Sequence, residues 1–310
     1  MTRPKTTPGN GFLAGSATRR RRERLVGRIF LASATLTIVI STLIVASLVG
    51  GAVEFLGKID PSQLLADGWY PRRGEFGIVT LVAGTLVVSG IALLVAVPVG
   101  LLSAIYLSEY AQARARRTIK PILEVLAGIP SVVLGFFALT FISPTFVQNL
   151  NPAAPTFNLF SAGLAVGILS IPLIASVSED AMRAVPSSLR EASYALGARR
   201  LTTSLTVVIP AAISGIVAAI IIGVSRTIGE TMIVAVAAGG SGGAAFTLNP
   251  FDQGQTITAA MAALASGSDQ VTGDTAAYQS LFFLGLTLFV ITFVLNQAGD
   301  LLVRRTRRAY

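Results

Sequence analysis

Two charged residues, Arg226 and Glu230, stand in an otherwise apolar segment rich in glycine and isoleucine. A charge at the centre of a bilayer costs about 2.5–3.5 kcal/mol on insertion scales, so both side chains should face a pore or a partner. A guanidinium presents paired planar donors that match two oxygens of a phosphate group, and it stays charged at physiological pH. Arg226 is therefore the best candidate for an anion contact on a membrane pathway, and Ser225, Thr227 and Thr231 add hydroxyl donors nearby.

The spacing of the two charges leaves their role open. Residues four apart on a continuous helix lie on one face, so Arg226 and Glu230 can neutralise each other. In this structural interpretation the pair only makes the segment tolerable in the membrane. In the functional interpretation Glu230 orients Arg226, or prevents an anion from being trapped so tightly that it cannot leave.

Composition places the chain in a bilayer. Of 310 residues, 53% are hydrophobic and only 13% are charged, and the mean hydropathy is +0.72. A soluble surface of this size needs more charge. The chain has no His and no Cys, which removes the usual soft metal ligands, thiol nucleophiles and imidazole chemistry. We therefore expect no metal site and no catalytic residues.

The apolar segments predict an all-α membrane protein with about six transmembrane helices. Spanning the ~30 Å hydrocarbon core takes about 20 helical residues. Six stretches are this long, at roughly 28–53, 78–107, 122–147, 159–178, 206–238 and 281–302. Pro98 leaves open whether the second stretch is one span or a tight pair.

Two small-residue motifs bear on how these spans fold. Residues 128–131 read Gly-Ile-Pro-Ser near one end of the third span, where the proline can bend the helix. Gly163 and Gly167 form a G-x-x-x-G motif in the fourth span, which permits close helix approach. Neither motif points to a particular function.

The distribution of Lys and Arg predicts the orientation, because these residues are retained on the cytoplasmic side. They cluster in the alternate loops and tails that an inside start makes cytoplasmic, around 3–28, 114–120, 183–200 and 304–308. The outer loops keep only Lys58, Arg72 and Arg73. We expect both termini in the cytoplasm, and the net charge of +9 then needs no nucleic acid to explain it.

This topology also divides the chain. We expect a cytoplasmic N-terminal tail over 1–27, a transmembrane domain over 28–303 with its core at about 78–303, and a short cytoplasmic tail over 304–310. Membrane lipid is the expected environment of the central domain.

The cytoplasmic loop over about 179–205 should carry a short surface helix. Ser188 and Glu191 match an S-x-x-E capping box, Pro186 blocks a helix upstream, and Gly197 suits a C-terminal cap, so a helix is expected at about 189–196. Leu189, Ala192 and Leu196 are then on one face, with Arg190 and Glu191 elsewhere on the surface. Such a helix either docks on a partner or rests on lipid headgroups.

This loop resembles the EAA loop of ABC-importer permeases, whose pattern is E-A-A, three residues, G, nine residues and I-x-L-P. The matching residues are Glu191-Ala192-Ser193, Gly197 and Val207-Val208-Ile209-Pro210, with conservative departures at Ser193, Val207 and Ile209. In that family the loop forms the coupling helix that enters a groove of the cytoplasmic ATPase. The resemblance therefore implies coupling contacts by Arg190, Glu191, Ala192, Ser193 and Gly197.

The resemblance extends over nearly the whole chain, to permeases of phosphate (Pst-type) importers. Residues 84–110, 124–139 and 225–232 look like these permeases, and the last segment, with Glu75 to Gly77 and residues 258–262, looks more like the C-type subunit (PstC) than its A-type partner. This implies the type I, MetI-like importer fold and a multi-pass protein of a prokaryotic cell membrane. It also implies that Arg226 and Glu230 matter for transport.

The same resemblance implies partners. The sequence contains no G-x-x-x-x-G-K-[ST] motif, so ATP and its Mg²⁺ are expected on a separate ATPase dimer, with no cofactor bound by this chain. The other implied partners are a second, A-type permease and an extracytoplasmic phosphate-binding protein.

Three alternatives to a phosphate permease remain open at this point. An arginine on a dry pathway suits another oxyanion, such as sulfate, molybdate or tungstate, as well as phosphate. An integral membrane enzyme is disfavoured, because Glu230 is the only acidic residue well inside an expected span. A regulatory scaffold that senses phosphate without transporting it is the third.

Overall fold

The structure, a computed structural model, describes residues 17–240, 242–267 and 275–306. In this part of the chain, six helical segments are long and apolar enough to cross a membrane. They are Arg22–Lys58, Ile78–Tyr110, Ser131–Leu150, Leu159–Arg183, Arg200–Ile228 and Ala276–Arg305. The predicted all-α fold with six spans is confirmed, while the domain boundaries at 27 and 303 stay a prediction.

The chain divides into two units, residues 1–50 and 51–310. Over the described part of the first unit the chain is a single helix, the main part of α1 (Ala17–Lys58). Its threonine hydroxyls are bonded locally, since those of Thr35, Thr37 and Thr42 each donate to the carbonyl four residues earlier. Such bonds let an apolar helix carry threonines without exposing unpaired donors.

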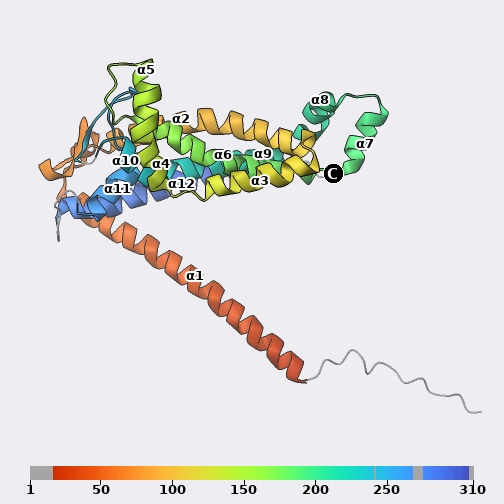
Figure 1. Ribbon diagram of the computed structural model, residues 1–310. Coiled ribbons are helices and arrows are strands. Elements are labelled where there is room, and N and C mark those ends of the chain that lie inside the picture. Colours follow the sequence, from red (N-terminus) through yellow and green to blue (C-terminus); the bar gives the residue numbers. More distant parts are fainter. Residues whose placement is uncertain (1–16, 241, 268–274, 307–310) are drawn as a thin grey trace, which may run out of the picture. The chain divides into compact units, whose positions relative to one another are not determined.

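The core of the second unit is built on α6 (Leu159–Arg183), which packs along α2 (Ile78–Ile105) (Figure 1). The glycines of the predicted G-x-x-x-G motif face α2. A Cβ on Gly163 would lie 2.8 Å from that of Ile91, and one on Gly167 would lie 2.9 Å from the Ala92 carbonyl oxygen. Only glycine permits this approach, so the motif brings the two backbones together as expected.

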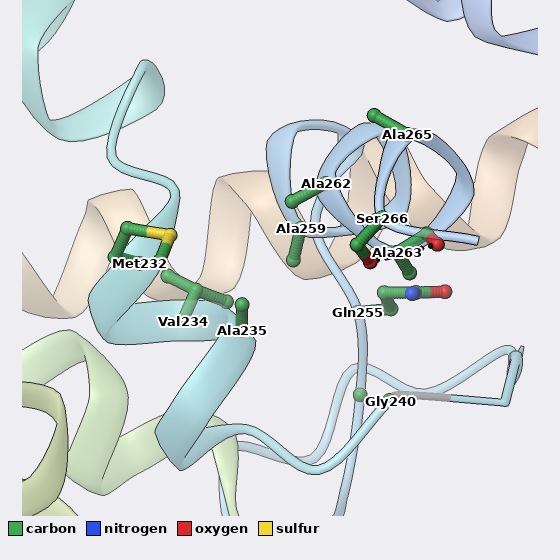
Figure 2. A pocket seen from close by; sticks show the side chains of 11 residues that line it. Met232, Val234, Ala235, Gly240, Gln255, Ala259, Ala262, Ala263, Ala265 and Ser266 are labelled. Carbon is green, nitrogen blue, oxygen red and sulfur yellow. Dashed lines mark hydrogen bonds between the residues drawn. The ribbon is translucent and has the colours of Figure 1, made fainter. Parts of the chain in front are cut away.

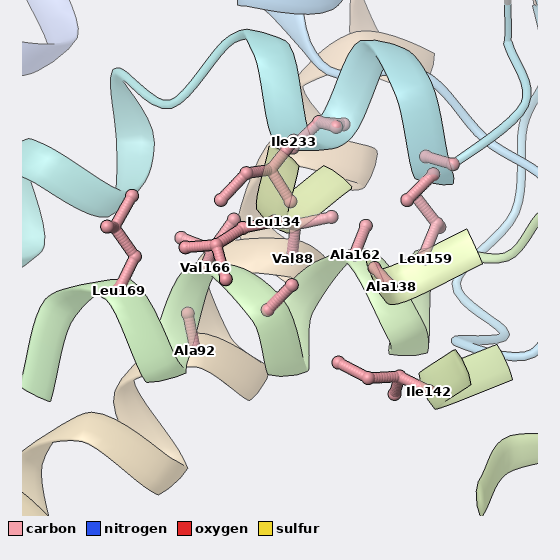
Figure 3. Close-up of a cluster of buried hydrophobic side chains, with 14 of the residues drawn as sticks. Val88, Ala92, Leu134, Ala138, Ile142, Leu159, Ala162, Val166, Leu169 and Ile233 are labelled. Atoms are coloured by element: carbon pink, nitrogen blue, oxygen red, sulfur yellow. The ribbon is translucent and has the colours of Figure 1, made fainter. Parts of the chain in front are cut away.

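Three further segments surround α6, namely α4 (Ser131–Phe137), the π-helical η5 (Ala138–Val147) and α10 (Met232–Ala237). Their inward side chains fill one apolar cluster with those of α2 and α6 (Figure 3). The cluster includes Val88, Ala92, Leu134, Ala138, Ile142, Leu159, Ala162, Val166, Leu169 and Ile233. Small alanines alternate with large aliphatic residues, which lets the helices interdigitate.

The second span is one continuous element, because α2 runs through Pro98 and continues into the π-helical η4 (Tyr106–Tyr110). The third span starts later than the predicted residue 122. A separate helix, α3 (Ala113–Ala127), ends before Gly128, and the span begins only at Ser131 of α4. Pro130 restricts the backbone before it, so the chain bends there as predicted but also leaves the helix.

The fifth span ends earlier than the predicted residue 238. It comprises α8 (Arg200–Thr203), the π-helical η6 (Ser204–Val208) and α9 (Ile209–Ile228). The sixth span is α12 (Ala276–Thr306), which packs on α9. Two short helices complete the connections, α5 (Gln148–Leu150) after η5 and α7 (Ser187–Ala195) between α6 and α8.

Within the second unit, α7 and α8 lie at one end of the bundle, and α10 and α11 (Ile257–Ala265) lie at the other (Figure 1). The α11 end carries a small antiparallel sheet in the order β2-β1-β3. Its strands are β1 (Gly68–Tyr70), β2 (Glu75–Phe76) and β3 (Ala244–Ala245), with the 3₁₀ turns η2 (Pro61–Leu65) and η3 (Pro71–Arg73) beside them. Trp69 of β1 is buried against Phe55 and Phe76 in a second apolar cluster.

Candidate functional site

The segment that holds Arg226 and Glu230 is not one continuous helix. α9 ends at Ile228, Gly229 caps it, and α10 starts only at Met232. Glycine is a poor helix former, which explains why the chain leaves the helix at this residue. The prediction that the arginine and the glutamate share one helical face is therefore wrong. Among the described residues, neither side chain has an ion-pair partner.

The three hydroxyls predicted to donate to an anion already donate within the chain. Ser225 donates to the side-chain oxygen of Asn296 on α12 at 2.9 Å. Thr227 and Thr231 donate to nearby backbone carbonyls at 2.9 and 3.2 Å. A hydroxyl carries a single proton, so in this arrangement the three side chains can only accept. Their role toward an anion stays a prediction.

The break after α9 is held against α11. The Thr258 hydroxyl donates to the backbone carbonyl of Glu230 at 2.8 Å. A cavity of about 500 Å³ lies between α10 and α11, with Met232, Gln255 and several alanines on its walls (Figure 2). Since none of the described residues that line it is charged, its described walls have little to offer an anion.

Arg226 lines a different cavity, of about 210 Å³, on the other side of the break. Its walls come from α3, α6 and α9, and they combine four charged side chains, one serine and several apolar residues. The lining residues are Lys120, Leu123, Glu124, Ala127, Leu169, Pro172, Leu173, Ser176, Glu179 and Arg226. A volume many times the ~10–15 Å³ needed for one water leaves room for a small hydrated anion. The sequence did not predict that residues of α3 would line this site.

Glu179 is the functional candidate that sequence reasoning missed. α6 continues to Arg183, beyond the predicted end at 178, and Glu179 in its last turns is fully buried. Its carboxylate lies 3.3 Å from Lys120, 3.4 Å from Arg116 and 3.8 Å from Arg183. Within the described chain neither oxygen has a hydrogen-bond partner, so opposite charge holds the group in place. The sequence did contain a signal for this contact, because Glu179 is an acidic residue at the cytoplasmic end of an expected span and residues 114–120 form a basic stretch expected on the same side.

Lys120 links this buried carboxylate to the cavity. Its ammonium is also 3.2 Å from Asp180, which is largely exposed. Burial lowers the pKa of Lys120, but the hydrogen bond to Asp180 and the charges of Glu179 and Asp180 raise it, and the net shift is upward from 10.5. Lys120 therefore stays protonated at neutral pH, and its charge is already compensated by two carboxylates.

A chain of polar contacts continues from this cluster to α7. Arg116 of α3 donates to the backbone carbonyls of Leu107 and Ser108 in η4. The next residue, Glu109, is almost fully buried and forms an ion pair of 3.0 Å with Arg190 of α7. Buried ion pairs of this kind hold the geometry of the elements that carry them, because breaking one leaves a charge uncompensated.

The predicted surface helix in the loop is confirmed as α7, with one correction. It begins at Ser187 with Pro186 as its N-cap, and no side chain caps it. The predicted capping box of Ser188 and Glu191 is therefore wrong, because the N-cap is Pro186 and Ser188 already lies inside the helix. Gly197 adopts the left-handed conformation, with φ of 79°, and closes the helix as predicted.

The residues predicted to couple to an ATPase divide into two groups. Glu191 and Ala192 are exposed. Ser193 is half-buried and shares a hydrogen bond of 2.9 Å with the Thr203 hydroxyl. Arg190 is turned inward, where it also donates to the carbonyls ending α6, so the prediction that it lies on the surface is wrong. The most exposed apolar side chain here is Leu196, at 90%.

The helical arrangement is that of the transmembrane subunits of type I ABC importers. The chain superposes on a subunit of the MetNI methionine transporter with a TM-score of 0.56 at 22% identity, covering 81% of this chain and 100% of that one. It superposes on a subunit of a bacterial importer of the acidic polysaccharide alginate with a TM-score of 0.63 at 17% identity, covering 93% and 100%. These similarities define the fold.

Residues 96–308 match the family described as the binding-protein-dependent transport system inner membrane component. The chain belongs to this family. It is therefore a multi-pass membrane protein and the permease subunit of an ABC importer, a channel subunit and not an enzyme. Membership implies that it works with an ATPase and a substrate-binding protein.

Three curated relatives match over most of their length. The phosphate transport system permease protein PstC of Pasteurella multocida is 31% identical, with 86% of each chain covered. PstC 1 of Mycobacterium tuberculosis is 35% identical, over 77% of this chain and 75% of that one. The probable ABC transporter permease protein YqgH of Bacillus subtilis is 29% identical, over 91% of both.

Proposed function

We propose that this chain is the C-type permease of a phosphate importer and forms one half of its path through the membrane. The observation that carries the proposal is Arg226, which has no ion-pair partner in the described part of the chain and lines a small cavity at the end of a membrane helix. The names of the PstC relatives support phosphate as the substrate. A guanidinium suits this substrate, since it can bind two oxygens of one anion at once.

The proposal includes an orientation and three partners. The α7 end, with its basic loop and the exposed side chains of Glu191 and Leu196, lies in the cytoplasm, where an ATPase dimer docks on α7. The α11 end faces outward and receives an extracytoplasmic phosphate-binding protein, while an A-type permease forms the other half of the path. ATP and its Mg²⁺ bind to the ATPase.

The test compares phosphate uptake by the wild-type importer and by an Arg226→Gln variant, with all partners present in proteoliposomes. Loss of a charge that meets the anion should lower uptake by at least about 30-fold. Insertion and assembly should survive, because Arg226 has no partner within the described chain to leave unpaired. The control is Arg304→Gln, since Arg304 is exposed and its ion pair among the described residues is with the exposed Asp300. Undiminished uptake by Arg226→Gln would refute the role of this arginine.

Another oxyanion is the second candidate, because an arginine alone does not select phosphate. Uptake of sulfate, molybdate or tungstate in preference to phosphate by the same proteoliposomes would favour it. Phosphate-dependent signalling without flux would instead favour a sensing scaffold.

A further inference from the structure

Two of the four charged side chains in the Arg226 cavity are already compensated. Lys120 and Glu179 lie 3.3 Å apart. Lys120 also pairs with Asp180, and Glu179 also pairs with Arg116. Such paired charges gain little from binding a further ion. The binding chemistry of the cavity is therefore carried by the other two, Arg226 of α9 and Glu124 of α3.

Glu124 and Arg226 face the same cavity without forming an ion pair with each other. Both side chains are exposed, and among the described residues neither has a hydrogen-bond or ion-pair partner. The helices that carry them, α3 and α9, both pack on α6 (Figure 1), and all three helices contribute residues to the cavity wall. One wall thus offers donors and positive charge, and the other offers an acceptor with negative charge.

This pair of groups favours anions that keep a proton at neutral pH over anions that keep none. An ionised carboxylate can only accept hydrogen bonds, whereas a guanidinium can only donate. A ligand that satisfies both must carry a negative charge for Arg226 and an O–H for Glu124. Inorganic phosphate keeps at least one proton at neutral pH and meets both conditions. Sulfate keeps none, so its oxygens would face the carboxylate as like charges.

We propose that this cavity is a binding site for a protonated tetrahedral oxyanion, in which Arg226 binds the charged oxygens and Glu124 accepts the hydrogen bond of the P–OH group. Glu124 is then a specificity-determining residue that excludes sulfate inside the permease. Lys120 and Glu179 hold the adjoining wall and keep its charge neutral. This inference rests on the proposed function and adds to it a source of anion discrimination within this chain.

The test uses the assembled importer, with both permeases and the ATPase, purified without its binding protein so that only the membrane complex can select. Equilibrium binding of radiolabelled inorganic phosphate and sulfate is measured at neutral pH. The wild type should bind phosphate more tightly than sulfate by about tenfold or more, a modest ratio because water screens the exposed Glu124.

The variant Glu124→Gln should lower the ratio of phosphate affinity to sulfate affinity by about tenfold, mainly through tighter sulfate binding. An amide can donate to sulfate and still accept from phosphate. Glu124→Asp keeps the charge and should keep the preference for phosphate. Glu75→Gln, at an exposed glutamate of β2 outside the cavity, is the matched control and should leave both affinities unchanged.

Three results would overturn the inference. They are an unchanged ratio in Glu124→Gln, an equal loss of both anions in that variant, and no saturable phosphate binding by the wild type. None of these results contradicts the proposed function as long as the complete importer takes up phosphate. If the complete importer takes up none, the proposed function fails as well, so the two failures are distinguishable.

Discussion

Two groups of charged side chains in the second unit have opposite properties. In the first, Glu109 pairs with Arg190, and Glu179 is surrounded by cations, so that buried acids are compensated within the chain. In the second, Arg226 and Glu124 line a cavity and pair with no described residue. The difference teaches that charge near a membrane core can have two uses, since paired groups fix the positions of helices, whereas unpaired groups are available for the ligand contact that we propose.

The sharpest way to break this comparison is to remove the carboxylate at the centre of the paired group. Glu179→Ala should lower the free energy of unfolding by about 3 kcal/mol, because it removes the carboxylate beside Arg116 and leaves Lys120 with only the exposed Asp180. Thermal unfolding of the purified protein measures this. Asp180→Asn is the control, since Asp180 is 64% exposed and should contribute less than about 1 kcal/mol. Full stability of Glu179→Ala would mean that the paired group does not hold the helices.

A double-mutant cycle on Arg190 and Glu109 tests the link from α7 to the rest of the group. Arg190→Gln and Glu109→Gln should each destabilise the chain, and the double variant should lose less than their sum by about 1–2 kcal/mol. The reason is that the first substitution already removes the interaction. The exposed pair of Arg304 and Asp300 should couple by less than about 0.5 kcal/mol in a parallel cycle. Equal coupling in the two cycles would contradict the distinction between them.

The smallest expected effect concerns Lys120, which belongs to the paired group and also lines the cavity. Lys120→Gln should cost about 1 kcal/mol of stability, since the side chain is 28% exposed and screened by water. Its pKa is raised in the folded chain, so its contribution is complete below its ordinary value of 10.5 and is lost as the pH rises through the folded value. The stability gap between wild type and variant should thus stay constant around neutral pH and close only in strong alkali. A gap that changes near neutral pH would assign the effect to another group.

The spans were predictable because each needs only an uninterrupted apolar stretch of sufficient length. The ends of the spans were not, because they depend on single residues. Gly229 ends α9 after Ile228, well before the predicted end of the span at residue 238, and this separates Arg226 from Glu230. The bend at Pro130 was predictable, but the independence of α3 was not, since nothing local shows that its basic side chains turn toward α6.

The candidate site was predictable only in part for the same reason. Arg226 stood out because a charge in an apolar run is costly wherever it points. Glu124 and Lys120 looked like ordinary loop and helix-end residues, since their meaning comes from the packing of α3 on α6. The position of Arg190 also depends on tertiary contacts, because a helical wheel cannot show that Glu109, far away in the sequence, lies beneath it.

The exposed Leu196 bears on how stable the subunit is in the cell before it assembles with its partners. It lies in a loop between two spans, and 90% of its surface is uncovered by the rest of the chain. Under the proposed function the ATPase covers this loop, so a chain made without its partner displays an apolar tip to the proteases and chaperones of the cytoplasm. Unassembled subunits are then degraded first, and the scarcest partner sets how many importers the cell keeps.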